Sequence, residues 1–378
     1  MLDERNDMNK FRQKRRRKTL LVRSAVFLAV MVGLILVAAN WRKLIEPLKD
    51  AALNPGEGGF PVTLPGSTQY VMGELGENFY LLTDTYLYTY NAVGAELSGI
   101  QHGFQRAASS SNDRRVLVYD KNGMDFKMFS RTSELFSKTM EDTVVFAEMG
   151  NVERCAAVTT SSRYSNYLYI FNGEGKQIFR WASPDEKIMR VEFGNNDDSV
   201  FVTVLGESGG DLRTSVMRFD VGNAESEIWK TYLSSDLPLS LERCEDGIYV
   251  VTSGGAFLLD ELTGVITAQT AFTRQVTGVT ETDGMRAVLF HDAASNGDIA
   301  VAYGDGLSAA AAITPSGVTA FDVCAGRMYI LEGTKLLAFN SMMEGVKTYD
   351  LDDVYSDVKI MNNCAYLLGY NTVQRVEL

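Results

Sequence analysis

The sequence predicts an all-β protein, a β-propeller with eight blades favoured and seven possible, that follows one N-terminal transmembrane helix. Two observations lead to this prediction. An apolar stretch of 21 residues lies close to the N-terminus, and the chain after residue 60 repeats a unit of turns and strands about every 40 residues. Together they divide the chain into a cytoplasmic basic tail (1–18), a transmembrane helix (19–40), a linker (41–59) and a propeller ectodomain (60–378).

The apolar stretch, TLLVRSAVFLAVMVGLILVAA from Thr19 to Ala39, is long enough to cross a bilayer. As a helix it would span about 31 Å at about 1.5 Å per residue, which matches the hydrocarbon core. Seven Lys and Arg residues precede it between Lys10 and Lys18. This asymmetry favours a signal-anchored, single-pass protein of the cell membrane, with a cytoplasmic N-terminus and an extracytoplasmic C-terminal domain.

Two other interpretations of the N-terminus stay open. The small residues Val37 to Ala39 offer a site for signal peptidase, although the long basic segment and the long apolar segment favour a retained anchor. The basic run could also bind nucleic acid or direct nuclear import, but its position directly before an apolar span favours the membrane.

The two parts of the chain carry opposite net charges. Residues 1–49 contain 12 Lys and Arg against 4 Asp and Glu, a net charge of +8. Residues 50–378 contain 24 Lys and Arg against 44 Asp and Glu, a net charge of −20. So acidic an ectodomain repels nucleic acid and anionic lipid. The linker is rich in Pro and Gly, which predicts an extended tether.

The repeat defines the fold of the ectodomain. Each unit begins with a polar turn, continues with an apolar strand of about five residues, and then has a second turn and another strand. Eight units start at Gly76, Asn112, Glu153, Asn196, Glu242, Thr282, Cys324 and Asn362. A lone four-stranded sheet cannot bury both of its faces, whereas radial stacking of such sheets into a propeller buries both. A β-sandwich with irregular strands is the alternative fold.

The two ends of the ectodomain complement each other. The last unit stops at Leu378 without a full set of strands, while GFPVTLPG (Gly59 to Gly66) reads as an outer strand with no inner strands before it. We expect this early segment to complete the final blade and close the ring, because an open blade would leave an unpaired edge.

Two segments, DGIYVVTSGGAFLLDELTGVITAQ (Asp246 to Gln269) and, more loosely, Gly326 to Tyr349, resemble blades of the PQQ-like and outer-membrane-assembly lipoprotein propellers. The complete layout is similar to an uncharacterised family, a domain of unknown function, of single-pass surface proteins from clostridia and related Gram-positive bacteria with a PQQ-like or WD40-like propeller. The resemblance implies a fold and no activity. Quinone-binding members have a Trp that is missing here after Gly264, and vicinal cysteines that are also missing, so no cofactor is implied.

No catalytic, cofactor-binding or metal-binding residue is predicted. The segment GESGG (Gly206 to Gly210) fits the G-x-S-x-G motif of serine hydrolases. A nucleophile elbow needs a helix after the serine, but strand-like segments on both sides place Ser208 at a hairpin tip. The two possible bases, His102 and His291, have no sequence context that aims them at Ser208.

Metal sites and paired carboxylates give no stronger signal. Acidic clusters at Asn195 to Ser199 and at Asp350 to Asp357 could offer oxygen ligands to calcium, but neither has the spacing of a calcium loop, so solvated turns are expected. With two histidines and no Cys-x-x-Cys, no zinc site follows from local spacing. No pair of acids stands out for glycoside hydrolysis.

The four cysteines, Cys155, Cys244, Cys324 and Cys364, each lie near the turn before a unit's first apolar strand. Equivalent buried positions in a ring would explain this spacing, since free Cys packs as a small hydrophobe. A disulfide between Cys324 and Cys364, one repeat apart, is the alternative.

These features favour a membrane-anchored, non-enzymatic binding or scaffold module, whose rim loops and central opening hold a protein or cell-envelope component. Neither a cofactor nor a nucleic acid partner is expected. The alternative function is an extracellular glycan-acting hydrolase or lyase that uses channel carboxylates. A sensor that relays ectodomain occupancy is disfavoured, because a tail of 18 residues has no room for an output domain.

Overall fold

The computed structural model describes residues 58–378 apart from 68, 223–225, 283–284 and 295–296, together with residues 23, 27, 28 and 30–32. The chain divides into two units, residues 1–54 and 55–378. The few described residues of the first unit are helical. Among the described residues, no helix combines the length and the apolar character that a membrane crossing needs. The predicted tail, most of the predicted span (19–40) and the linker up to residue 57 lie outside the described residues.

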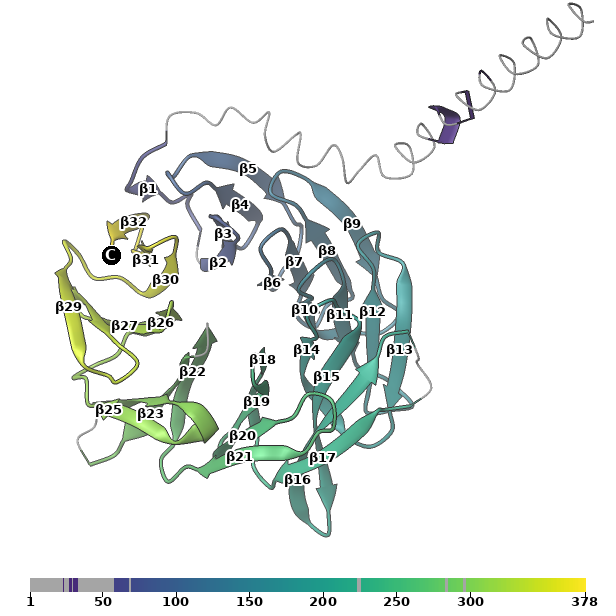
Figure 1. Cartoon of the computed structure of the whole chain (residues 1–378). Coiled ribbons are helices and arrows are strands. Elements are labelled where there is room, and N and C mark those ends of the chain that lie inside the picture. The colour runs from purple at the N-terminus through teal and green to yellow at the C-terminus, as the bar shows by residue number, and fades with distance from the viewer. Residues whose placement is uncertain are drawn as a thin grey trace, which may run out of the picture. The chain divides into compact units, whose positions relative to one another are not determined.

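The second unit is a β-propeller of eight four-stranded antiparallel sheets arranged around a common centre (Figure 1). In seven blades the strands follow sequence order, with the first strand nearest the centre and the fourth at the rim. The predicted all-β propeller is confirmed. The structure decides for eight blades over seven and against a β-sandwich.

The strands of the first four blades are as follows. Blade 1 contains β2 (Val71–Leu75), β3 (Asn78–Leu82), β4 (Tyr86–Tyr90) and β5 (Glu96–Gln101). Blade 2 contains β6 (Ala107–Ser111), β7 (Val116–Asp120), β8 (Asp125–Phe129) and β9 (Glu134–Thr139). Blade 3 contains β10 (Val144–Met149), β11 (Cys155–Thr159), β12 (Asn166–Phe171) and β13 (Gln177–Ser183). Blade 4 contains β14 (Lys187–Phe193), β15 (Ser199–Ser208), β16 (Asp211–Asp220) and β17 (Trp229–Ser234).

The other four blades continue the series. Blade 5 contains β18 (Pro238–Cys244), β19 (Gly247–Thr252), β20 (Gly255–Leu259) and β21 (Ile266–Ala271). Blade 6 contains β22 (Val276–Thr282), β23 (Met285–Asp292), β24 (Gly297–Tyr303) and β25 (Ala309–Ile313), with a short 3₁₀ helix, η1 (Asp305–Leu307), before β25. Blade 7 contains β26 (Ala320–Cys324), β27 (Arg327–Glu332), β28 (Lys335–Phe339) and β29 (Gly345–Asp350). Blade 8 contains β30 (Asp357–Met361), β31 (Cys364–Leu368), β32 (Thr372–Glu377) and β1 (Val62–Thr63).

Burial follows the position of a strand within its blade. Every residue of the second strands β3, β11, β19 and β31 is buried. These strands have a neighbouring blade on each face, so both faces need apolar side chains. The outer strand β21 instead alternates half-buried and exposed residues, because at the rim one of its faces is turned to solvent. This difference explains why the sequence shows continuous apolar runs between stretches of mixed character.

The hydrophobic core is divided among the gaps between adjacent blades. One cluster joins blades 3 and 4 through side chains that include Ile170 and Phe193. Another joins blade 8 to blade 1 through side chains that include Phe79 and Tyr366. Since each blade packs against two neighbours, the ring depends on every junction, including the one that joins its two ends.

Strand β1 closes the ring, as predicted from GFPVTLPG. Val62 pairs with Val373 and Thr63 pairs with Thr372 of β32, and the N–H of Leu64 donates to the carbonyl oxygen of Asn371 at 2.8 Å. The ring of Phe60, just before β1, lies 6.3 Å from that of Phe79 in blade 1 and 5.8 Å from that of Tyr366 in blade 8. The early segment therefore holds the first and last blades together.

The Asp-Glu-Leu-Thr-Gly turn of blade 5 makes a contact that the sequence analysis missed. Gly264 has a φ of +70°, and a Cβ there would lie 2.5 Å from the ring of Trp229. Trp229 belongs to β17 of blade 4, and its Nε1–H donates to the carbonyl oxygen of Glu261 at 3.2 Å. No Trp follows Gly264 in its own blade, but the preceding blade supplies one that docks on this turn.

Candidate functional site

The serine motif forms a hairpin tip, as predicted. Ser208 pairs with Asp211 at the end of the β15–β16 hairpin, whose two-residue turn is made by Gly209 and Gly210 with φ values of +67° and +93°. His102 is buried between blades 1 and 2, where its Nε2 lies 3.1 Å from the carbonyl oxygen of Thr83. Ser208 and the two histidines therefore lie in different parts of the ring, and no triad is assembled.

The first acidic cluster is only partly solvated, which corrects the prediction. Asp197 is buried, and its carboxylate accepts hydrogen bonds from four consecutive backbone N–H groups of blade 3, residues 151–154, at 2.7–3.1 Å. Its neighbour Asp198 is exposed and forms an ion pair with Arg154 at 3.4 Å. The cluster joins the first turns of blades 3 and 4. No group of three or more potential metal ligands occurs in the described part of the chain.

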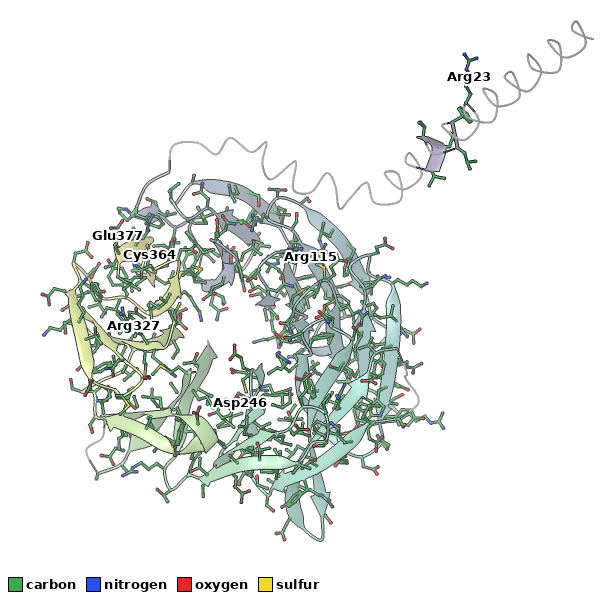
Figure 2. The ribbon with its side chains drawn as sticks, viewed as in Figure 1. Arg23, Arg115, Asp246, Arg327, Cys364 and Glu377 are labelled. Atoms are coloured by element: carbon green, nitrogen blue, oxygen red, sulfur yellow. The ribbon has the colours of Figure 1, made fainter. Side chains whose placement is uncertain are left out.

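Similar contacts join neighbouring blades elsewhere in the ring, at the turns between their first and second strands. Arg286 of blade 6 forms an ion pair with Asp246 of blade 5, which lies near the centre of the ring in Figure 2. The second acidic cluster behaves differently, because Asp352 accepts a hydrogen bond from the hydroxyl of Tyr355 at 2.6 Å within its own loop. Hydrogen bonding to Tyr355 lowers the pKa of Asp352. This cluster fits the predicted turn.

All four cysteines are free thiols beside the turn between the first and second strands of a blade. Cys244 and Cys324 end first strands, whereas Cys155 and Cys364 begin second strands. Three are buried, and Cys324 is half-buried. Burial raises the pKa of the Cys155 thiol. The predicted placement near this turn is confirmed, but the cysteines occupy two different strand positions, and the alternative bridge between Cys324 and Cys364 is not formed.

The first strands bring together a set of residues that sequence reasoning missed, which we call the inner belt. Each belt residue lies one or two pairs before the turn that ends its blade's innermost ladder. The eight residues, in blade order, are Glu74, Ser110, Glu148, Glu192, Glu242, Thr280, Asp322 and Lys359. Five carry a carboxyl group. Alignment of the eight units on these turns would have shown that most first strands carry a polar residue close to the turn.

The carboxyl groups of blades 3 to 5 act on one another. The hydroxyl of Ser110 donates to the carboxyl of Glu148, and burial raises the pKa of Glu148 to about 7. The pKa of Glu192 lies well above its usual range because of burial, followed by the charges of Glu148 and Glu242. Glu192 therefore keeps its proton more readily than an ordinary glutamate.

The opposite part of the belt surrounds a cation. Burial and then the charge of Asp322 raise the pKa of Glu74 to about 7, although its side chain remains exposed. Asp322 is buried and accepts a hydrogen bond from the N–H of Ile360 at 2.7 Å. Burial opposes the charge on Lys359, but the charges of Asp322, Asp357 and Glu74 raise its pKa. This sector joins blades 7, 8 and 1.

The belt therefore offers chemically distinct groups near the same end of the first strands. Carboxyl groups that titrate near neutral pH donate hydrogen bonds when protonated and attract cations when ionised. Nearby arginines already have partners: Arg243 donates to Glu261 at 3.0 Å, and Arg190 donates to the carbonyl oxygen of Leu239 at 3.0 Å. The belt thus contains more acidic than basic groups.

Comparison with solved structures finds other propellers. The chain is similar to BamB from Moraxella catarrhalis, with a TM-score of 0.57 and 9% identity over 83% of this chain and 99% of that one. It is similar to the C-terminal WD40 domain of Sif2 (TM-score 0.63, 9% identity, 85% and 99% covered). It is also similar to Sqt1 from Saccharomyces cerevisiae (TM-score 0.61, 10% identity, 86% and 100% covered). At these identities the likeness shows the fold alone.

Sequence comparison identifies a family and no activity. None of the curated proteins matches the chain. The model of a family of unknown function, DUF5711, matches residues 64–305, which is more than half of the chain. The chain therefore belongs to the family of unknown function DUF5711.

Proposed function

We propose that this protein is a membrane-anchored, extracytoplasmic binding module that scaffolds a protein or cell-envelope component. The observation that carries the proposal is the inner belt. Burial of a carboxyl group lowers stability unless the group is protonated or paired, and a propeller needs no acids at these positions. Five carboxyl groups near the same end of the first strands are therefore better explained by a ligand than by the fold.

The ring architecture supports this role. Eight blades packed on both sides hold the turns of each face in fixed positions, so one molecule offers many loops to a partner. The belt adds a preference for groups that donate hydrogen bonds or carry positive charge, such as the Lys or Arg side chains of a protein loop. The apolar stretch from Thr19 to Ala39 and the charge asymmetry around it support the membrane anchor.

Site-specific photo-crosslinking in the native membrane tests the proposal. A photoreactive residue at Glu74, the exposed member of the belt, is expected to give a discrete adduct with one envelope component. The matched control is Ile178 on the outer strand β13, which is also exposed. The same adducts from both positions, or none from Glu74, would contradict binding at the belt.

A second candidate function is a glycan-acting hydrolase or lyase, which the raised pKa values of Glu148 and Glu192 favour. A carboxyl group that stays protonated near neutral pH can serve as a general acid, and an ionised neighbour as its partner. Incubation of the protein with cell-wall glycans would reveal this activity as product release. Turnover that is lost in both Glu148→Gln and Glu192→Gln would favour the enzyme over the scaffold.

A further inference from the structure

The outer strand of blade 8 is much shorter than its counterparts. β1 has two residues, whereas the outer strands of the other blades have five to seven. The side chains of Tyr88 and Tyr90 in blade 1 belong to the same apolar cluster as Val62 of β1. The short strand therefore covers only one end of this face of blade 1.

Three tyrosines line the face beside β1. Tyr86, Tyr88 and Tyr90 alternate along β4, so their side chains share one face, about 7 Å apart along the strand. Tyr90 is buried, Tyr88 is half-buried, and Tyr86 is 36% exposed. The rings of Tyr86 and Tyr88 lie 5.5 Å apart. Exposure therefore increases along the row, away from β1.

A glycine on the neighbouring strand leaves room for the central ring. Gly99 of β5 pairs with Tyr88, and a Cβ at this position would lie 2.8 Å from Cε1 of Tyr88. The ring of Tyr88 thus leans across the outer strand at a position that has no side chain. Any larger residue at 99 would have to displace it.

A cavity of about 420 Å³ lies at the buried end of the row, where Pro61 and Thr63 face Tyr90, Gly94 and Glu96. The carboxylate of Glu96 makes no hydrogen bond or ion pair with any residue that the structure describes. The structure thus combines two neighbouring tyrosine rings tilted by 32°, a hollow lined by Tyr90, and an acceptor that is available to a ligand. Concave sites with aromatic walls and a few polar groups are typical of ligand binding.

We propose that this groove, which we call the tyrosine groove (Tyr86, Tyr88, Tyr90, Glu96 and Gly99), binds a glycan chain of uncharged N-acetylated hexosamines. Sugar rings present C–H faces that pack on tyrosine rings, while their hydroxyl and amide groups bond to polar neighbours. The amide N–H of an acetamido group is a donor for Glu96. Net charge of −20 on residues 50–378 disfavours anionic glycans. The inference rests on the proposed function, because its ligand is a cell-envelope component.

Titration calorimetry of the full chain in detergent with the tetramer of N-acetylglucosamine tests the groove. Wild-type protein is expected to bind, and Tyr88→Ala to bind at least about tenfold more weakly, because a stacking ring is lost. Tyr88→Phe should bind like wild type. The matched control is Tyr370→Ala, which removes a 95% exposed tyrosine in blade 8 and should leave binding unchanged. Glucose tetramers, which lack the acetamido group, should bind more weakly.

Two outcomes would overturn the groove. The first is no binding of the N-acetylglucosamine tetramer by a wild-type protein that melts cooperatively. The second is binding that Tyr88→Ala leaves unchanged, or that Tyr370→Ala weakens equally. The crosslink from Glu74 does not depend on the tyrosine groove. It can therefore still be observed if the groove binds no glycan, and the two proposals are tested separately. Tetramer binding abolished by Glu192→Gln but not by Tyr88→Ala would move the glycan site to the belt.

Discussion

Replacement of Glu148 by Gln should make the propeller more stable at alkaline pH and leave its stability at acidic pH unchanged. In the folded protein the carboxyl group of Glu148 is half-buried and accepts a hydrogen bond from Ser110. Glutamine has nearly the same shape, and its amide oxygen can accept the same bond. The substitution therefore removes the titration of this group while it preserves its packing.

The magnitude follows from the pKa of the carboxyl group. Burial raises the pKa from 4.5 to about 7 on folding. Below pH 4.5 the group is protonated in both states and costs nothing. Between about pH 4.5 and 7 the unfolded chain releases this proton while the folded protein keeps it, so stability falls with rising pH, and above pH 7 the full loss of up to about 3 kcal/mol remains. Glu148→Gln should recover most of that loss at pH 8.

Denaturant unfolding of the full chain in detergent at pH 4.5 and pH 8 measures this effect. The control is Glu174→Gln, which changes an exposed glutamate in the same blade and should alter stability little at either pH. The Glu148→Gln variant should keep part of the pH dependence of the wild-type protein, because Glu192 also has a raised pKa. A variant that is destabilised at pH 8, or stabilised equally at both pH values, would refute the reasoning.

Three further predictions test closure, docking and topology. Deletion of residues 59–66 should lower the melting temperature by more than about 10 °C and promote aggregation through the freed edge. Deletion of residues 48–55 should do neither. Equal melting temperatures of the two variants would contradict closure by β1. Trp229→Ala should destabilise the ring by about 2–3 kcal/mol in denaturant unfolding, because the turn of blade 5 loses the ring packed on it; an unchanged midpoint would show that this docking contributes nothing. A cysteine at Ser67 should react with an impermeant maleimide on intact cells and one at Asn6 should not; labelling of both, or of neither, would contradict the proposed orientation.

Much of the fold could be predicted because its signals are local. An apolar run such as Gly247–Thr252, bounded by turn residues, indicates a strand without any knowledge of its neighbours. Repetition of that unit predicts the ring, and an unmatched strand at one end predicts its closure. The same locality kept Ser208 from being misassigned, because a hairpin tip is visible from the residues on either side of it.

The residues of the candidate sites could not be predicted in this way, because their environments come from other blades. The burial of Asp197 depends on a loop more than 40 residues away, and the docking of Trp229 on Gly264 joins two blades. The pKa of Glu192 reflects acids from the blades on each side.

By itself, the sequence determined the all-β class, the repeat of about 40 residues and the strand that joins the two ends, since strand and turn propensities act over a few neighbours. Only the tertiary structure decided that there are eight blades, that five carboxyl groups gather near one end of the first strands, and that a short outer strand leaves a row of tyrosines open. Each of these properties depends on how blades stack, and stacking brings together residues that no local pattern connects.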